Sequence, residues 1–128
     1  INGDYLPANM FRGSWIAAIA GNPITVQFIH RTLAYTLFVL VLIWTIRAVR
    51  LPGAPDRFLR LRWLPLLLVC VQITLGICSL LTSPWIEAHH WVAFDWLAEF
   101  HQITGLLFLL TMVGMLYLVM PVRRYVTV

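Results

Sequence analysis

Two histidines lie inside stretches that are otherwise apolar enough to cross a membrane. His30 lies in QFIHRTLAYTL, residues 27–37, and His101 lies in EFHQITGLLFL, residues 99–109. An ionisable side chain is costly in the hydrocarbon region, so one that is found there indicates a functional site. Two neutral imidazoles on facing helices would supply the axial ligands of a haem iron. The alternative is that the two histidines only form hydrogen bonds between helices.

Each histidine is followed one helical turn later by a small residue. Ala34 lies four residues after His30, and Gly105 lies four residues after His101. Side chains four residues apart share a helix face, so a small one leaves room for a flat ring against the helix. The predicted cofactor-binding residues are therefore His30, His101, Arg31, Ala34 and Gly105, with the two histidines as the metal ligands.

Arg31 is open to two interpretations. It could pair with a haem propionate, because arginine suits carboxylates, or its guanidinium could snorkel toward the lipid headgroups. Zinc is disfavoured, because a structural zinc site takes four ligands and no cysteine or carboxylate is expected at this depth. Glu87, His89 and His90 look like a metal cluster, but we interpret them as part of a solvated loop.

The composition predicts an integral membrane protein. The 128 residues are 61% hydrophobic and only 11% charged, which is far from a soluble domain. All of the basic residues are arginines, and the net charge is +4. They bracket the apolar runs and do not line a polar face, so we expect the lipid membrane as a partner and no nucleic acid.

Three membrane helices are expected to position the histidines, and no strand is expected. Asn22 is a good N-cap and Pro23 fits the first helical position, so the first helix begins there. Asp56 and Asp95 are expected to begin the second and third helices, and Pro65 is expected to kink the second. We predict an all-α fold, an integral membrane helical bundle with helices over residues 23–50, 56–82 and 95–120.

The domain organisation follows from these helices. Residues 1–22 are polar and rich in turn residues, and we interpret them as an outer loop. Their apolar run is too short to span, which allows a short helix at the membrane interface. Residues 23–128 form the transmembrane bundle. Polar side chains inside it are expected to form hydrogen bonds between helices, and these are Gln27, Gln72, Thr74, Gln102 and Thr104.

The arginines predict the orientation of the bundle. Five lie around the loop that joins the first two helices, in the last turn of one and the first turns of the next, and two follow the third. These two ends should therefore be cytoplasmic or face a mitochondrial matrix. The first and third helices then run in the same direction. His30 lies seven residues after Pro23, and His101 lies six after Asp95, so each is about 10 Å from the start of its helix. The two histidines should therefore lie at one depth.

The residues around the histidines also carry a family resemblance. The stretches NGDYLP (2–7), VQFIHRTLAY (26–35), QITLGICSLL (72–81) and HQITGLL (101–107) together resemble haem A synthase. That family has two homologous four-helix halves, each with a histidine pair. Its first half handles the haem O substrate, and its second half carries a haem b. The chain resembles the second half, because it has the His-Gln pair of that half and has Gln27 where the first half has a glutamate.

The resemblance implies a function. The whole enzyme would oxidise the methyl group of haem O to the formyl of haem A, and the iron ligands of haem b would be His30 and His101. This segment would serve electron transfer or structural support, with no catalytic residue of its own. An N-terminal half of the same chain, with the first helix of this half, and an unidentified electron donor are the implied partners. The bacterial cytoplasmic membrane or the mitochondrial inner membrane is the implied location.

Two other functions stay open on the sequence. One is a cytochrome-b-type membrane electron-transfer subunit without its own catalysis, and the other is a structural or transporter bundle without a cofactor. The chain also departs from the family pattern, because residues 1–22 lack the cysteine pair of many bacterial members. That departure bears on a thiol-linked step and not on the haem site.

Overall fold

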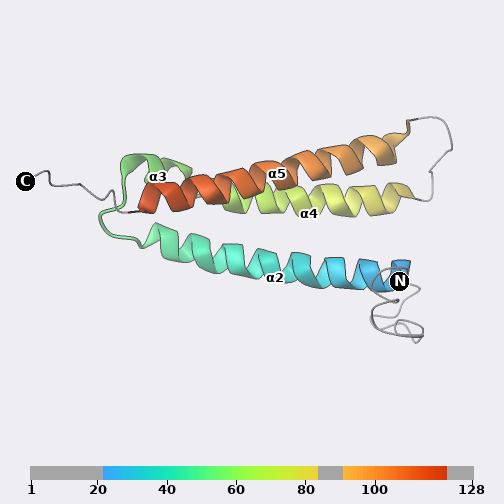
Figure 1. Ribbon diagram of the computed structural model, residues 1–128, viewed down its shortest axis with the longest axis horizontal. Coiled ribbons are helices and arrows are strands. Elements are labelled where there is room, and N and C mark those ends of the chain that lie inside the picture. Colours follow the sequence, from blue (N-terminus) through green and yellow to red (C-terminus); the bar gives the residue numbers. More distant parts are fainter. Residues whose placement is uncertain (1–21, 84–90, 121–128) are drawn as a thin grey trace, which may run out of the picture. The chain divides into compact units, whose positions relative to one another are not determined.

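The computed structural model describes residues 22–83 and 91–120, and this part of the chain is helical and contains no strand (Figure 1). Three segments are long and apolar enough to cross a membrane, namely Pro23–Val49, Asp56–Thr82 and Ala93–Val119, each of 27 residues. The predicted all-α membrane fold is therefore confirmed. The expected outer loop over residues 1–22 lies almost wholly outside the described residues.

The first helix, α2 (Pro23–Val49), begins where the sequence predicted. The Ile24 N–H donates to Oδ1 of Asn22 at 3.0 Å, and the Val26 N–H donates to the Asn22 carbonyl oxygen at 3.0 Å. Asn22 thus satisfies backbone donors that the first turn of a helix leaves unpaired. The chain divides into two compact units, residues 1–39 and 40–128, and each is described here by itself.

The second span, Asp56–Thr82, is interrupted just before Pro65, near the predicted kink. α3 (Asp56–Leu61) and α4 (Leu64–Thr82) are separated by Arg62 and Trp63. Pro65 explains the interruption, because proline has no N–H to donate to the carbonyl four residues earlier, and its ring clashes with that carbonyl. The carbonyl in question is that of Leu61, where α3 ends.

The helix boundaries also correct two predicted caps. Asp56 is the first residue of α3, and the N-cap is Pro55. α5 (Ala93–Val119) begins two residues before Asp95, and the carboxylate of Asp95 accepts the Val92 N–H at 2.9 Å. Asp95 thus acts from the third helical position, as the acidic residue of a capping box does.

The second unit is built on α4 and α5, which lie side by side and run in opposite directions (Figure 1). At one end of the pair, Phe58 of α3 and Met115 of α5 are each 2% exposed and pack with Ala48 of α2. The Trp44 ring meets the Phe58 ring edge to face, with 6.0 Å between centroids. This apolar cluster joins the last turns of α2 to α3 and α5.

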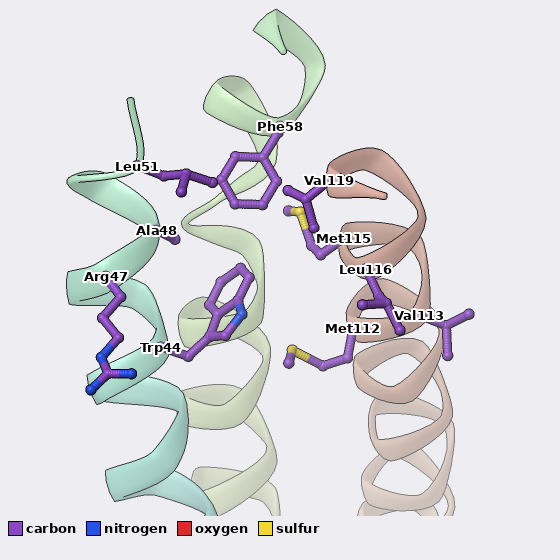
Figure 2. A pocket seen from close by; sticks show the side chains of 10 residues that line it. All are labelled: Trp44, Arg47, Ala48, Leu51, Phe58, Met112, Val113, Met115, Leu116 and Val119. Carbon is purple, nitrogen blue, oxygen red and sulfur yellow. The ribbon is translucent and has the colours of Figure 1, made fainter. Parts of the chain in front are cut away.

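A cavity of about 450 Å³ lies beside this cluster, and side chains from α2, α3 and α5 line it (Figure 2). Trp44 points into the space between α2 and α5, and the guanidinium of Arg47 points away from it. The lining residues of α5 begin at Met112. That is eleven residues beyond His101, or about 16 Å along a helix, so the cavity is separate from the histidine.

Replacing Phe58 by alanine should destabilise the second unit. The buried ring fills the cluster, and removal of a buried aromatic side chain costs about 3–5 kcal/mol. The free energy of unfolding, measured by titration of the detergent-embedded chain with a denaturing detergent, should fall accordingly. Leu59→Ala is the control, because Leu59 is 36% exposed. Equal losses in the two variants would contradict the role of Phe58.

Candidate functional site

His101 of α5 is held by one residue of α4. Its Nδ1 lies 3.0 Å from the backbone carbonyl oxygen of Gln72, and its Nε2 lies 3.1 Å from the side-chain amide nitrogen of the same residue. The imidazole is half-buried between the two helices. Gln72 was expected to form hydrogen bonds between helices, and these two contacts confirm it.

One arrangement of hydrogens on the imidazole satisfies both contacts. A backbone carbonyl can only accept, so Nδ1 must carry the hydrogen that is donated to Gln72. In a neutral imidazole the other nitrogen, Nε2, is then an acceptor, and the Gln72 amide must present its NH₂ group to it. The assignment is consistent at both ends, because the amide nitrogen is the atom facing Nε2. Both contacts are therefore satisfied together when Nδ1 donates and Nε2 accepts.

Gly76 allows the imidazole to reach the backbone of α4. A Cβ atom on Gly76 would lie 3.1 Å from Cε1 and 3.4 Å from Nδ1 of His101. In an α-helix the carbonyl of Gln72 points toward the residue four positions later, which is Gly76. With no side chain there, the second lone pair of that carbonyl is open to the ring. The signal in the sequence is a glycine four residues after a glutamine.

Gly105 leaves space for the side-chain amide of Gln72. A Cβ atom on Gly105 would lie 3.1 Å from the Gln72 amide nitrogen. The sequence predicted a space for a flat ring one turn after His101, and the flat group found there is the Gln72 amide. Its oxygen, Oε1, is buried and accepts no hydrogen bond within the described part of the chain. We call the space between His101 and Gly105 the notch.

The other predicted residues lie elsewhere or outside the description. His30, Arg31 and Ala34 are on α2 in the first unit, where His30 is exposed and the other two are half-buried. Because each unit is described by itself, the pairing of His30 with His101 stays a prediction. The loop residues Glu87, His89 and His90 lie outside the described residues.

Thr74 does not act as predicted. Its hydroxyl donates to the Cys70 carbonyl oxygen at 3.0 Å, on its own helix, and its side chain is exposed. A threonine hydroxyl can always bond to the carbonyl one turn earlier, so it needs no partner on a second helix. The Gln72 side chain does not bond to its own helix in this way. Its amide contacts His101 on α5 instead.

The geometry of His101 fits an axial ligand of a haem iron. Within residues 22–83 and 91–120, no three His, Cys, Asp or Glu side chains lie together to hold a metal ion by themselves. A porphyrin, however, supplies four of the iron ligands and asks the protein for two at most. Ligating histidines commonly donate their other ring N–H to a backbone carbonyl, which fixes the tautomer. Here Nδ1 makes that bond, and Nε2 keeps the lone pair.

Comparison with known proteins extends this observation. Residues 1–113 match the sequence model of a family described as cytochrome oxidase assembly protein, COX15-CtaA. A heme A synthase of Rhizobium etli is 43% identical over 84 residues, covering 63% of this chain and 22% of the relative. Heme A synthases of Agrobacterium fabrum and Nitrosospira multiformis are 40% and 37% identical over 83 and 82 residues, each again covering 63% of this chain.

The chain spans about a fifth of the length of these curated relatives, since it covers 22% and 23% of the Agrobacterium and Nitrosospira proteins. No solved structure matches the chain. The family match covers both histidine-bearing stretches, residues 27–37 and 99–109.

Proposed function

Because the chain belongs to the cytochrome oxidase assembly protein family, COX15-CtaA, we propose that it is the haem b-binding part of a haem A synthase. The observation that carries the proposal is the contact of His101 Nδ1 with the Gln72 carbonyl oxygen at 3.0 Å. This arrangement leaves Nε2 as the ligating atom. The curated relatives named heme A synthase support the enzyme family in this proposal.

The proposed roles divide among the predicted residues. Haem supplies one-electron chemistry at its iron. His101 and His30 would hold it by their ring nitrogens, and Arg31 would pair with a propionate carboxylate. Ala34 and Gly105 would leave space for the ring beside each histidine. The apolar helices would exclude water from the ring and so set the dielectric that tunes its potential.

The wider activity belongs to the same proposal. The whole enzyme would oxidise the methyl group of haem O to the formyl of haem A, with the catalytic half outside these 128 residues. This segment would transfer electrons or support that half. Its partners would be the lipid membrane, an N-terminal half of the same chain, and an electron donor. The three spanning helices make it an integral membrane protein, and the bacterial relatives favour the bacterial cytoplasmic membrane.

Haem analysis of the purified full chain tests this function. We expect a reduced-minus-oxidised spectrum with the sharp bands of low-spin, bis-histidine haem. Extraction and chromatography should identify haem b, together with haem O or haem A where the catalytic half is present. Protein from a haem-deficient host is the control. A preparation that binds no haem when haemin is supplied would contradict the proposal, and haem b alone in a catalytically complete chain would favour an electron carrier.

A further inference from the structure

We propose that the side chain of Gln72 is a placeholder for haem. In the haem-free protein its amide would fill the notch between His101 and Gly105 and would hold Nε2 of His101 until haem displaces it. The inference rests on the proposed function, since it takes Nε2 as the iron-binding atom. It assigns to Gln72 a positioning role and no contact with the reacting atoms.

Gln72 contacts His101 through two different groups. Its backbone carbonyl accepts the Nδ1 hydrogen at 3.0 Å, and its side-chain amide donates to Nε2 at 3.1 Å. The carbonyl bond is compatible with a ligated Nε2, so it can persist when haem is bound. The amide bond is not, because one lone pair on Nε2 cannot serve both the amide and an iron.

The side-chain amide of Gln72 lies against Gly105. A Cβ atom on Gly105 would come within 3.1 Å of the amide nitrogen. A haem ligated by Nε2 must bring its flat ring to the face of α5 beside His101, and the residue one turn later shares that face. The amide and the ring therefore compete for one space as well as for one atom.

The side-chain amide of Gln72 is weakly held. Its Oε1 is buried and accepts no hydrogen bond from the described residues. A buried acceptor without a partner carries a desolvation cost, which offsets part of the hydrogen bond to Nε2. Hydrogen bonds between membrane helices are in any case modest, at about 0.6 kcal/mol on average. The contact is strong enough to satisfy the imidazole in an apolar bundle and weak enough for a cofactor to displace.

Gln72→Ala tests the placeholder directly. The substitution removes the amide and keeps the carbonyl, and alanine is a good helix former, so α4 should be retained. With the amide contact removed, the haem-free full chain should bind haemin about three- to tenfold more tightly. The dissociation constant is measured from the Soret band during titration in detergent. Gln72→Asn, whose shorter side chain draws the amide back from Nε2, should shift affinity in the same direction.

Thr74→Ala is the matched control. Thr74 lies two residues away on α4, is exposed, and bonds only to its own helix in the contacts described above. Its loss should leave the affinity for haemin within twofold of the unsubstituted chain. A second readout is the ¹⁵N spectrum of histidine in the haem-free protein. Gln72→Ala should shift the Nε2 resonance of His101, because the contact with the amide is lost, and should leave the Nδ1 resonance unchanged.

Two results would overturn the inference, and they are separable from failure of the proposed function. An affinity that is unchanged or weaker in both Gln72 variants would show that the amide does not compete with haem. An Nε2 resonance that is insensitive to Gln72→Ala would show that the contact is absent. If His101→Ala loses haem in the same series, the proposed function stands and the placeholder alone fails. If His101→Ala keeps its haem, both fail.

Discussion

His101→Ala should abolish the low-spin haem spectrum of the full chain. The substitution removes the Nε2 lone pair that the proposed site offers to the iron, together with both contacts between the imidazole and Gln72. We expect less than a tenth of the original low-spin absorbance, measured per mole of purified protein. His30→Ala should have the same effect, because six-coordinate low-spin iron needs both axial ligands.

Chemical rescue sharpens this experiment. Free imidazole added to His101→Ala can occupy the vacated volume and should restore the low-spin bands, as it cannot in a chain that has failed to fold. Ile103→Ala is the control on α5, since its side chain is 46% exposed. If either alanine variant retains a full complement of low-spin haem, the histidine pair is not the ligand set.

The sequence predicted the helices more accurately than their ends. Composition and length suffice for the spans, because the bilayer requires about twenty apolar residues in each. Asn22 was a correct cap, since its side chain and Pro23 act locally. Pro65 predicted a kink, and the structure has an interruption at Arg62 and Trp63, just before Pro65, with the backbone of both residues still in the right-handed helical region. The predicted start of α5 was Asp95, whose carboxylate caps from inside the helix.

The site was predicted in part. The histidine and the small residue one turn later are visible in a single helix, and so is the depth of His101 from the start of α5. The contact with Gln72 is not, because it depends on the register of α4 against α5. Gly76 illustrates the difference, since the sequence indicates only a small residue that allows close helix packing. The structure shows that it uncovers one particular carbonyl for the imidazole.

Gly76→Leu should remove most of the bound haem without removing α4, because leucine is a good helix former. Even the first atom of the new side chain would lie 3.1 Å from Cε1 of His101. The imidazole must then leave the Gln72 carbonyl or force α4 and α5 apart, and overpacking of this kind costs about 1–3 kcal/mol. The affinity for haemin, measured by Soret titration, should fall at least tenfold.

Gly76→Ala provides the graded version of the same test. Its Cβ atom requires the ring to move by only a few tenths of an ångström, so haem should still bind. The Nδ1 hydrogen bond should weaken, and since that bond makes the imidazole a stronger electron donor, the midpoint potential of the haem should rise. The potential is measured by redox titration of the reduced haem band.

Gly114 is the matched control, because it is a helical glycine of α5 at which an added Cβ atom would meet no atom of the described residues within 4 Å. Gly114→Leu and Gly114→Ala should leave both the affinity and the potential unchanged. The comparison between Gly76 and Gly114 decides the cause of the loss. A general need for small residues in membrane helices would make substitutions at the two glycines equivalent. Equal losses at positions 76 and 114 would therefore refute the specific contact between Gly76 and His101, whereas a graded response confined to position 76 would support it.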